Sequence, residues 1–130
     1  MSYAVVAIGG GLGAMARYGL NVWLQRDYEF PFGTFTANLL GCLLMGIVAQ
    51  LVAHSEWFNA SGLIPDQYRL LFAVGFLGSF TTLSALVFEV NTLATRSEML
   101  LAFGYLLASV AGGFACFFAG VFAARALLSP

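Results

Sequence analysis

The chain is organised as four long apolar stretches separated by three shorter, more polar segments. The apolar stretches cover residues 3–24, 32–53, 70–90 and 99–127, and most charged residues fall between them. A helix needs about 20 mainly apolar residues to cross a bilayer. The pattern therefore predicts an all-α membrane protein with four transmembrane helices, in which residues 1–130 form a single transmembrane domain.

Composition and the placement of aromatic residues support a location in the membrane. Apolar residues make up 61% of the chain and charged residues 8%, whereas a soluble domain carries about 25% charged residues. Aromatic rings prefer the headgroup layer, and four of them lie at or near the ends of the stretches: Trp23, Tyr28, Trp57 and Tyr68. The net charge of −1 argues against nucleic-acid binding, which requires a basic surface.

The arginines give almost no preference for one orientation. If the helices alternate in direction, Arg69 and Arg125 lie on one side of the membrane and Arg26 and Arg96 on the other, with Arg17 leaning towards the latter. Basic residues near the span ends set the orientation, and here they nearly cancel. We therefore predict dual topology, with two oppositely oriented copies paired about a two-fold axis in the membrane plane. A fixed topology with a weak signal is the alternative.

The middle of the third stretch is unfavourable for a continuous helix. Residues 75–84 contain two glycines and four hydroxyl residues. A broken helix at this depth is tolerated only where it is buried in protein or lines a cavity, and its freed carbonyl groups often coordinate a cation. We predict such a break. The alternative is an intact helix whose Ser and Thr side chains bond back to the preceding turn.

Glycines elsewhere predict close helix contacts. Gly9 and Gly13 form a GxxxG step in the first stretch, and small residues at this spacing let two helix backbones approach closely. We interpret this step as a contact surface.

The polar side chains deep inside the stretches are hydrogen-bond donors. They form two pairs spaced four residues apart, so that each pair shares a helix face: Thr34 with Asn38, and Tyr105 with Ser109. Glu89 is placed at the end of the third helix, which leaves no carboxylate at the centre. Neutral donors can replace the water around a small anion without a fixed charge that would retain it. Proton or cation transport would instead favour a central acid, so the chemistry favours an anion pathway.

Enzyme chemistry is not predicted. Cys42 and Cys116 lie in apolar runs without the spacing of a metal site, and His54 is the only histidine. The chain contains no glycine-rich phosphate loop and no Ser/His/Asp set. The two thiols are interpreted as inert packing groups.

Three motifs resemble those of a known family. The runs GGGLGAMARY (residues 9–18), PFGTFTANLLG (residues 31–41) and GFLGSFTTLS (residues 75–84) are similar to those of the Fluc (CrcB) fluoride channels. The resemblance covers essentially the whole chain, in order, with four spans.

This resemblance implies an inner-membrane homodimer of antiparallel subunits that exports cytoplasmic fluoride passively through two pores. A structural sodium ion would be held at the dimer interface by the backbone carbonyls of Gly78 and Thr81. Arg17 would attract anions at a vestibule. The residues matching the fluoride pathway are Asn38, Thr82, Leu83, Ser84, Leu86, Tyr105 and Ser109.

The chain departs from the family pattern after the predicted break. Phenylalanines of the family are replaced by Leu83 and Leu86, and Ser79 and Ala85 replace a glycine and a threonine. A phenylalanine offers an anion its positive ring edge, which leucine lacks. We expect slower conduction, unless the ring of Phe80 or of Phe88 turns into the vacated space. The alternative is that a second, different subunit is required.

Two other functions remain open on the sequence. A small multidrug-resistance type exporter would need a glutamate in its first helix, where this chain has Arg17 and no acid. A structural membrane subunit without a pathway would need neither the deep donors nor the helix break.

Overall fold

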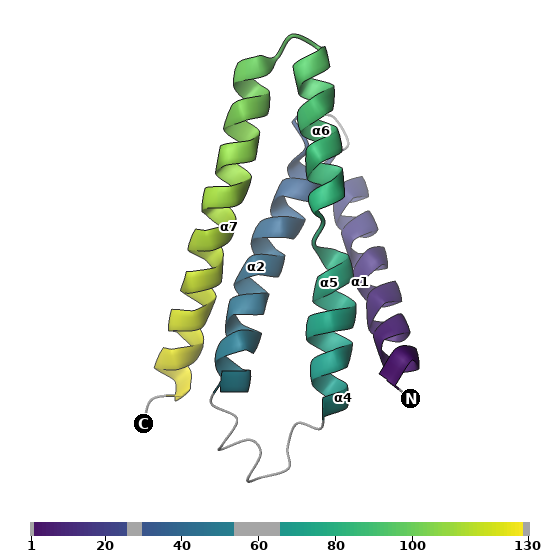
Figure 1. The fold of residues 1–130 in the computed structure, drawn as a ribbon, viewed down its shortest axis with the longest axis vertical. Coiled ribbons are helices and arrows are strands. Elements are labelled where there is room, and N and C mark those ends of the chain that lie inside the picture. Colours follow the sequence, from purple (N-terminus) through teal and green to yellow (C-terminus); the bar gives the residue numbers. More distant parts are fainter. Residues whose placement is uncertain (1, 26–29, 54–65, 129–130) are drawn as a thin grey trace.

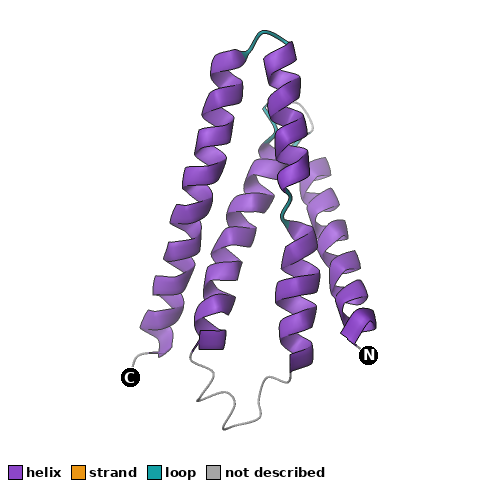
Figure 2. Ribbon diagram, in the orientation of Figure 1, coloured by secondary structure: helices purple, strands orange, loops and turns teal. Residues whose placement is uncertain are grey.

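The computed structural model describes residues 2–25, 30–53 and 66–128, and all regular structure in these ranges is helical. Elements α4 to α6 follow one another along one rod, so the described chain forms four rods, and the predicted all-α class is confirmed there (Figures 1 and 2). The elements are α1 (Ser2–Leu24), α2 (Phe32–Ala53), α4 (Asp66–Arg69), η1 (Leu70–Leu77), α5 (Gly78–Phe80), α6 (Leu83–Thr95) and α7 (Met99–Leu128).

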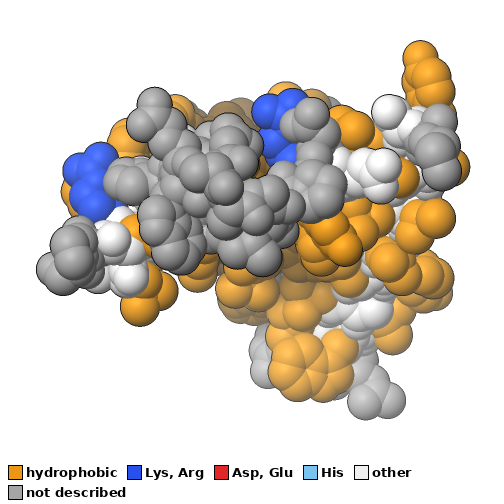
Figure 3. All heavy atoms as spheres, turned by 90° about the horizontal axis from the view of Figure 1, so that it is seen from below, with side chains coloured by type: hydrophobic (Ala, Val, Ile, Leu, Met, Phe, Trp, Pro, Cys, Tyr) orange, Lys and Arg blue, Asp and Glu red, His pale blue; other side chains and the backbone are white. Residues whose placement is uncertain are grey.

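The rods alternate in direction, as the orientation argument assumed. The start of α1, the end of α2, the start of α4 and the end of α7 lie at one end of the molecule, and α6 and α7 are joined at the other end (Figure 1). Arg69 and Arg125 therefore lie at the end opposite Arg96. Seen from below, basic side chains form patches on a largely hydrophobic surface (Figure 3). Several residues used in the predictions lie outside the described ranges: Arg26, Tyr28, His54 and Trp57.

Among the described residues, three helices are long and apolar enough to cross a membrane: Phe32–Ala53, Gln67–Thr95 and Met99–Leu128. They overlap three of the four predicted spans. Helix α1 forms over nearly the predicted residues but is not among the three, because its many glycines and Arg17 add little apolar surface. The third rod is longer than predicted. It continues to Thr95 and ends in a short turn, in which Ser97 has a positive φ of 65°.

Glycines allow α1 to lie directly against η1, an eight-residue π-helical segment. A side chain at Gly9 would collide with the carbonyl oxygen of Leu71, and one at Gly13 would collide with the carbonyl oxygen of Phe76. Gly75 lies on the η1 side of the same contact. The absence of side chains lets the two backbones meet. The predicted contact role of Gly9 and Gly13 is confirmed.

A similar contact joins α2 to α7. A side chain at Gly46 of α2 would strike the carbonyl oxygen of Phe117, and one at Gly120 of α7 would strike the carbonyl oxygen of Leu43. The two helices therefore cross with their backbones close together. This contact fixes the position of the α7 side chains next to the middle of the third rod.

The third rod breaks after Phe80. Thr81 (φ −86°, ψ 154°) and Thr82 (φ −154°, ψ 125°) have extended backbone between α5 and α6. The Thr82 hydroxyl caps α6, because it accepts a hydrogen bond from the Ala85 N–H at 3.3 Å. The predicted break is confirmed, and the alternative of an intact helix is wrong. The Thr81 hydroxyl nevertheless donates back to the Leu77 carbonyl, as that alternative expected.

A cluster of buried residues lies between α6 and α7. It contains Leu86, Leu93, Ala102 and Tyr105, with Phe30 and Phe35 packed against it. Most other large apolar side chains in the described ranges point outward. An outward-facing apolar surface of this extent suits a bilayer and is unsuited to water.

We expect Gly13→Ala to destabilise the protein. The added methyl would meet the Phe76 backbone, which cannot move without separating α1 from η1, and overpacking of this kind costs about 1–3 kcal/mol. Gly11→Ala is the matched control, because nothing lies within 4 Å of its new methyl group. Thermal unfolding in detergent micelles measures the difference. Equal melting temperatures for the two variants would contradict the packing argument.

Candidate functional site

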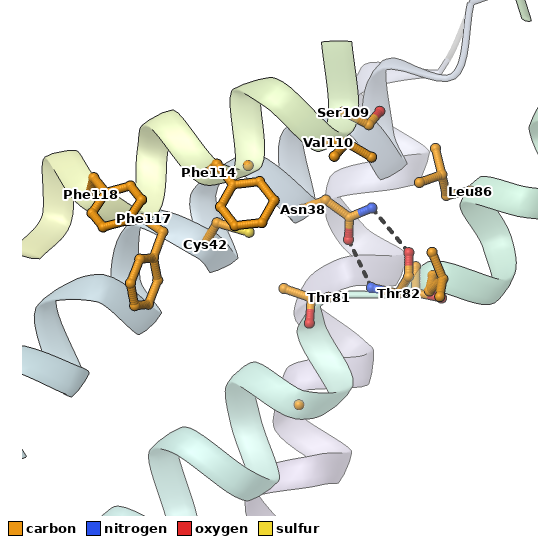
Figure 4. Close-up of a pocket in the computed structure, with 13 residues that line it drawn as sticks. Asn38, Cys42, Thr81, Thr82, Leu86, Ser109, Val110, Phe114, Phe117 and Phe118 are labelled. Atoms are coloured by element: carbon orange, nitrogen blue, oxygen red, sulfur yellow. Dashed lines mark hydrogen bonds between the residues drawn. The ribbon is translucent and has the colours of Figure 1, made fainter. Parts of the chain in front are cut away.

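The Asn38 side chain joins α2 to the break in the third rod. Its Nδ2 group donates to the Thr82 carbonyl at 3.0 Å, and its Oδ1 accepts the Thr82 N–H at 2.8 Å (Figure 4). The carboxamide oxygen thus replaces the helical acceptor that the break removes from the Thr82 N–H, and its Nδ2 group adds a second donor to the Thr82 carbonyl, the N-cap carbonyl of α6. The sequence suggested no partner for this deep amide, because the partner lies on another rod. One Nδ2 hydrogen remains after these two bonds are made.

The same hydrogen bonds release two backbone carbonyls. In a continuous α-helix, the N–H of residue i+4 donates to the carbonyl of residue i. The Thr82 N–H, which would serve Gly78, donates to Asn38 instead. The Ala85 N–H, which would serve Thr81, donates to the Thr82 hydroxyl instead. Gly78 and Thr81 are therefore the two residues whose carbonyls lose these helical donors.

A cavity of about 650 Å³ lies beside the break, between the third rod and α7. Its polar wall comes from α2, the break and α7. Its apolar wall comes from leucines after the break and phenylalanines of α7. The lining residues are Asn38, Cys42, Gly78, Thr81, Thr82, Leu83, Leu86, Ser109, Val110, Gly113, Phe114, Phe117 and Phe118.

Most of the predicted site residues meet at this cavity, but three do not line it. Asn38, Thr82, Leu83, Leu86 and Ser109 line it together with the predicted cation residues Gly78 and Thr81. The three that do not line it are Ser84, Tyr105 and Arg17. The Ser84 hydroxyl lies 3.2 Å from the Thr82 hydroxyl.

Ser109 is a buried polar residue of the cavity lining. The residue is only 7% exposed, and its Oγ atom has no hydrogen-bond partner in the described part of the chain. Buried hydroxyl groups are almost always hydrogen-bonded. The Ser109 hydroxyl is therefore a buried polar group that the described fold leaves unpaired beside the cavity.

Glu89 is a functional candidate that lies elsewhere on its helix than predicted. It lies midway along α6, where its Oε1 accepts the Thr34 hydroxyl and its Oε2 accepts the Tyr105 hydroxyl, both at 2.7 Å. Placing it at the helix end was wrong, because α6 continues to Thr95. The available signal was that Thr34 and Tyr105 each carry a deep hydroxyl group, and a buried hydroxyl needs a hydrogen-bond partner.

The cavity wall carries donors but no charge. None of its described lining residues is acidic or basic, and no group of three His, Cys, Asp or Glu in the described ranges could hold a metal ion. Amide and hydroxyl hydrogens can replace part of an anion's hydration shell. The geometry therefore suits the passage of a small anion better than its permanent capture.

The leucines after the break differ in their surroundings. Leu83 is 71% exposed, whereas Leu86 is 4% exposed and belongs to the α6–α7 core. Neither of the rings expected to compensate for them lines the cavity. Phe80 is buried and stacks on Phe76, and Phe88 is exposed elsewhere.

Comparison with known proteins places these features in a family. The family described as "CrcB-like protein, Camphor Resistance (CrcB)" matches residues 4–121. A protein named fluoride-specific ion channel FluC from Paracoccus denitrificans is 40% identical over 129 residues, which cover 98% of each chain. Proteins of the same name from Rhizobium etli and Phenylobacterium zucineum are 40% and 44% identical over 126 and 125 residues. They cover 95% and 93% of this chain, and 96% and 93% of their own.

We expect Asn38→Leu to lower the free energy of unfolding. Leucine is similar in size but can serve neither the N–H nor the carbonyl of Thr82, and an unsatisfied buried polar group costs about 1–3 kcal/mol. Ser109→Ala is the control, because it removes a hydroxyl that has no hydrogen-bond partner in the described part of the chain. Denaturant unfolding in micelles compares the two. The proposed structural role of Asn38 is wrong if both variants are as stable as the parent protein.

Proposed function

Because the chain belongs to the CrcB family, we propose that it is a passive, fluoride-selective channel through which cytoplasmic fluoride leaves the cell. It is a multi-pass protein of the inner membrane and, as a member of a channel family, not an enzyme. The single observation that carries the proposal is the uncharged, donor-lined cavity at the helix break.

Three donors on the cavity wall provide the proposed selectivity. The remaining Nδ2 hydrogen of Asn38 and the hydroxyls of Thr82 and Ser109 replace part of the water around fluoride. Fluoride is small and strongly hydrated, so it passes only if such donors compensate for the loss of water. A fixed positive charge at this place would hold the ion. Neutral donors let it continue.

Glu89 supports the pathway indirectly in this proposal. Its carboxylate receives the hydroxyl hydrogens of Thr34 and Tyr105, so these two groups are held in place between α2, α6 and α7. Both residues are almost completely buried. A fixed network of this kind keeps the donor wall from rearranging when water leaves the ion.

A second copy in the opposite orientation completes the proposed channel. Leu83, Phe114 and Phe118 line the cavity yet are each more than half exposed, so one subunit leaves this face open. Arg69 and Arg125 lie at one end of the molecule and Arg96 lies at the other. This small difference in positive charge gives only a weak preference for one orientation, so the chain can insert into the membrane in both. The resulting antiparallel homodimer would contain two equivalent pores.

A structural sodium ion on the two-fold axis fits the break. The carbonyls of Gly78 and Thr81 have lost these helical donors, and both residues line the cavity. Two copies supply four such oxygens. Neutral oxygen ligands of this type replace the hydration shell of an alkali cation.

A high-resolution structure of the purified protein in sodium-containing buffer tests the assembly. We expect two subunits in opposite orientations, with one density peak on their axis bounded by the four carbonyls of Gly78 and Thr81. Parallel subunits would contradict the antiparallel dimer, and an empty axis would contradict the sodium site.

Fluoride efflux from proteoliposomes tests the channel itself. We expect the purified protein to release fluoride but not chloride under an imposed gradient. Ser109→Ala should reduce efflux by about fivefold, because it removes one proposed hydrogen bond to fluoride, worth about 1 kcal/mol. Thr92→Ala is the control, because this hydroxyl bonds back to the Phe88 carbonyl away from the cavity.

Each competing function gives a different result in this assay. Exchange of protons for organic cations, without fluoride release, would identify an exporter. The absence of any flux from the assembled protein would support a structural subunit. Flux that appears only after a related protein is added would show that a second subunit is required.

A further inference from the structure

Phenylalanines of α7 form the apolar wall of the cavity. Phe114, Phe117 and Phe118 all line it, together with Asn38 and Thr82 on the polar side. In Figure 4, the Phe114 ring lies between Asn38 and the other two rings. The cavity is therefore polar beside the helix break and becomes aromatic further along α7.

Two of these rings are open to the cavity. Phe114 and Phe118 are one turn apart on α7, so they share a face, and they are 64% and 53% exposed. Phe117 is held more firmly. Its backbone carbonyl faces Gly46 of α2. The centroids of the Phe117 and Phe118 rings are 5.7 Å apart, and the ring planes meet at 82°.

The edge of a phenylalanine ring carries partial positive charge. An anion beside a ring edge is attracted without a hydrogen bond and without a fixed charge. The positions after the break carry Leu83 and Leu86, which have no such edge. The expected substitutes Phe80 and Phe88 do not line the cavity, so the α7 rings are the aromatic groups in the described chain that meet its polar wall.

The exposed fraction of a ring does not by itself distinguish these two phenylalanines. Phe103 and Phe122 lie on the same helix and are 61% and 62% exposed, yet neither lines the cavity. What separates Phe114 and Phe118 from them is a shared cavity with Asn38, Thr82 and Ser109. This difference supplies a matched comparison within one helix.

We propose that Phe114 and Phe118 of α7 are anion-guiding residues, whose ring edges take over the permeating ion from the donors at Asn38 and Ser109. This inference rests on the proposed fluoride channel and adds two residues to its pathway. The polar donors replace water at the break, and the rings stabilise the partly dehydrated ion along the next turn of α7. The chain thereby compensates for the leucines at 83 and 86 with rings from another helix.

The test compares two double variants in the fluoride efflux assay with the assembled protein. We expect Phe114→Leu with Phe118→Leu to slow efflux about tenfold, which corresponds to about 1.4 kcal/mol. Phe103→Leu with Phe122→Leu removes equally exposed rings outside the cavity and should stay within about twofold of the parent rate. Gel filtration shows whether both variants assemble.

A second measurement separates ring charge from ring size. Pentafluorophenylalanine at position 114 keeps the ring but reverses the sign of its edge, so efflux should fall as it does in the leucine variant. If the parent protein conducts fluoride while both the leucine pair and the fluorinated ring leave the rate unchanged, the guiding role is wrong and the channel proposal stands. If the parent protein conducts no fluoride, the channel proposal itself fails.

Discussion

The pairing of the Asn38 carboxamide with the Thr82 backbone is the contact on which the rest of the structure depends. A helix interrupted inside a membrane exposes backbone groups that water cannot reach, and each unmet group costs about 1–3 kcal/mol. Asn38 accepts the Thr82 N–H, which the break deprives of its helical acceptor, at 2.8 Å, and it also donates to the Thr82 carbonyl at 3.0 Å. Because its hydrogen bonds come from α2, the break is stable only while α2 lies beside the third rod.

Gly41 makes that approach possible. It lies less than one turn beyond Asn38 on α2, and a side chain there would collide with the Thr81 methyl group. One face of α2 therefore supplies both the bonds that hold the break and the space that accommodates it. The cavity, the released carbonyls of Gly78 and Thr81 and the outward turn of Leu83 all follow from this fit.

Much of this arrangement could be predicted from the sequence, because hydropathy and glycine content are local properties. The long apolar stretches predicted the helices, and the glycines and hydroxyl residues of 75–84 predicted the break. The partners of Asn38 and Glu89 could not be predicted, since each lies on another rod and depends on how the rods pack. The same limit applies to the aromatic wall. Phe114 and Phe118 look like ordinary lipid-facing residues until α7 is placed against the third rod.

The helix ends were predicted less well for a related reason. Residues 91–95 are partly polar and read as a loop, but they continue α6. In the structure, Thr92 and Thr95 bond to backbone carbonyls of their own helix, so their hydroxyls do not need solvent. Polar residues whose donors are satisfied locally can extend a helix beyond its apolar stretch.

The glycine contact between α1 and η1 also bears on the order in which the protein is assembled. Helix α1 is synthesised first, yet it is not one of the three strongly apolar helices, and the backbone that fits Gly9 and Gly13 belongs to residues 70–77. During synthesis, the glycine face therefore has no protein partner until the third rod has entered the membrane. In the finished protein, α1 is held by η1, which is synthesised later. The final position of α1 therefore depends more on packing against η1 than on the affinity of α1 for lipid.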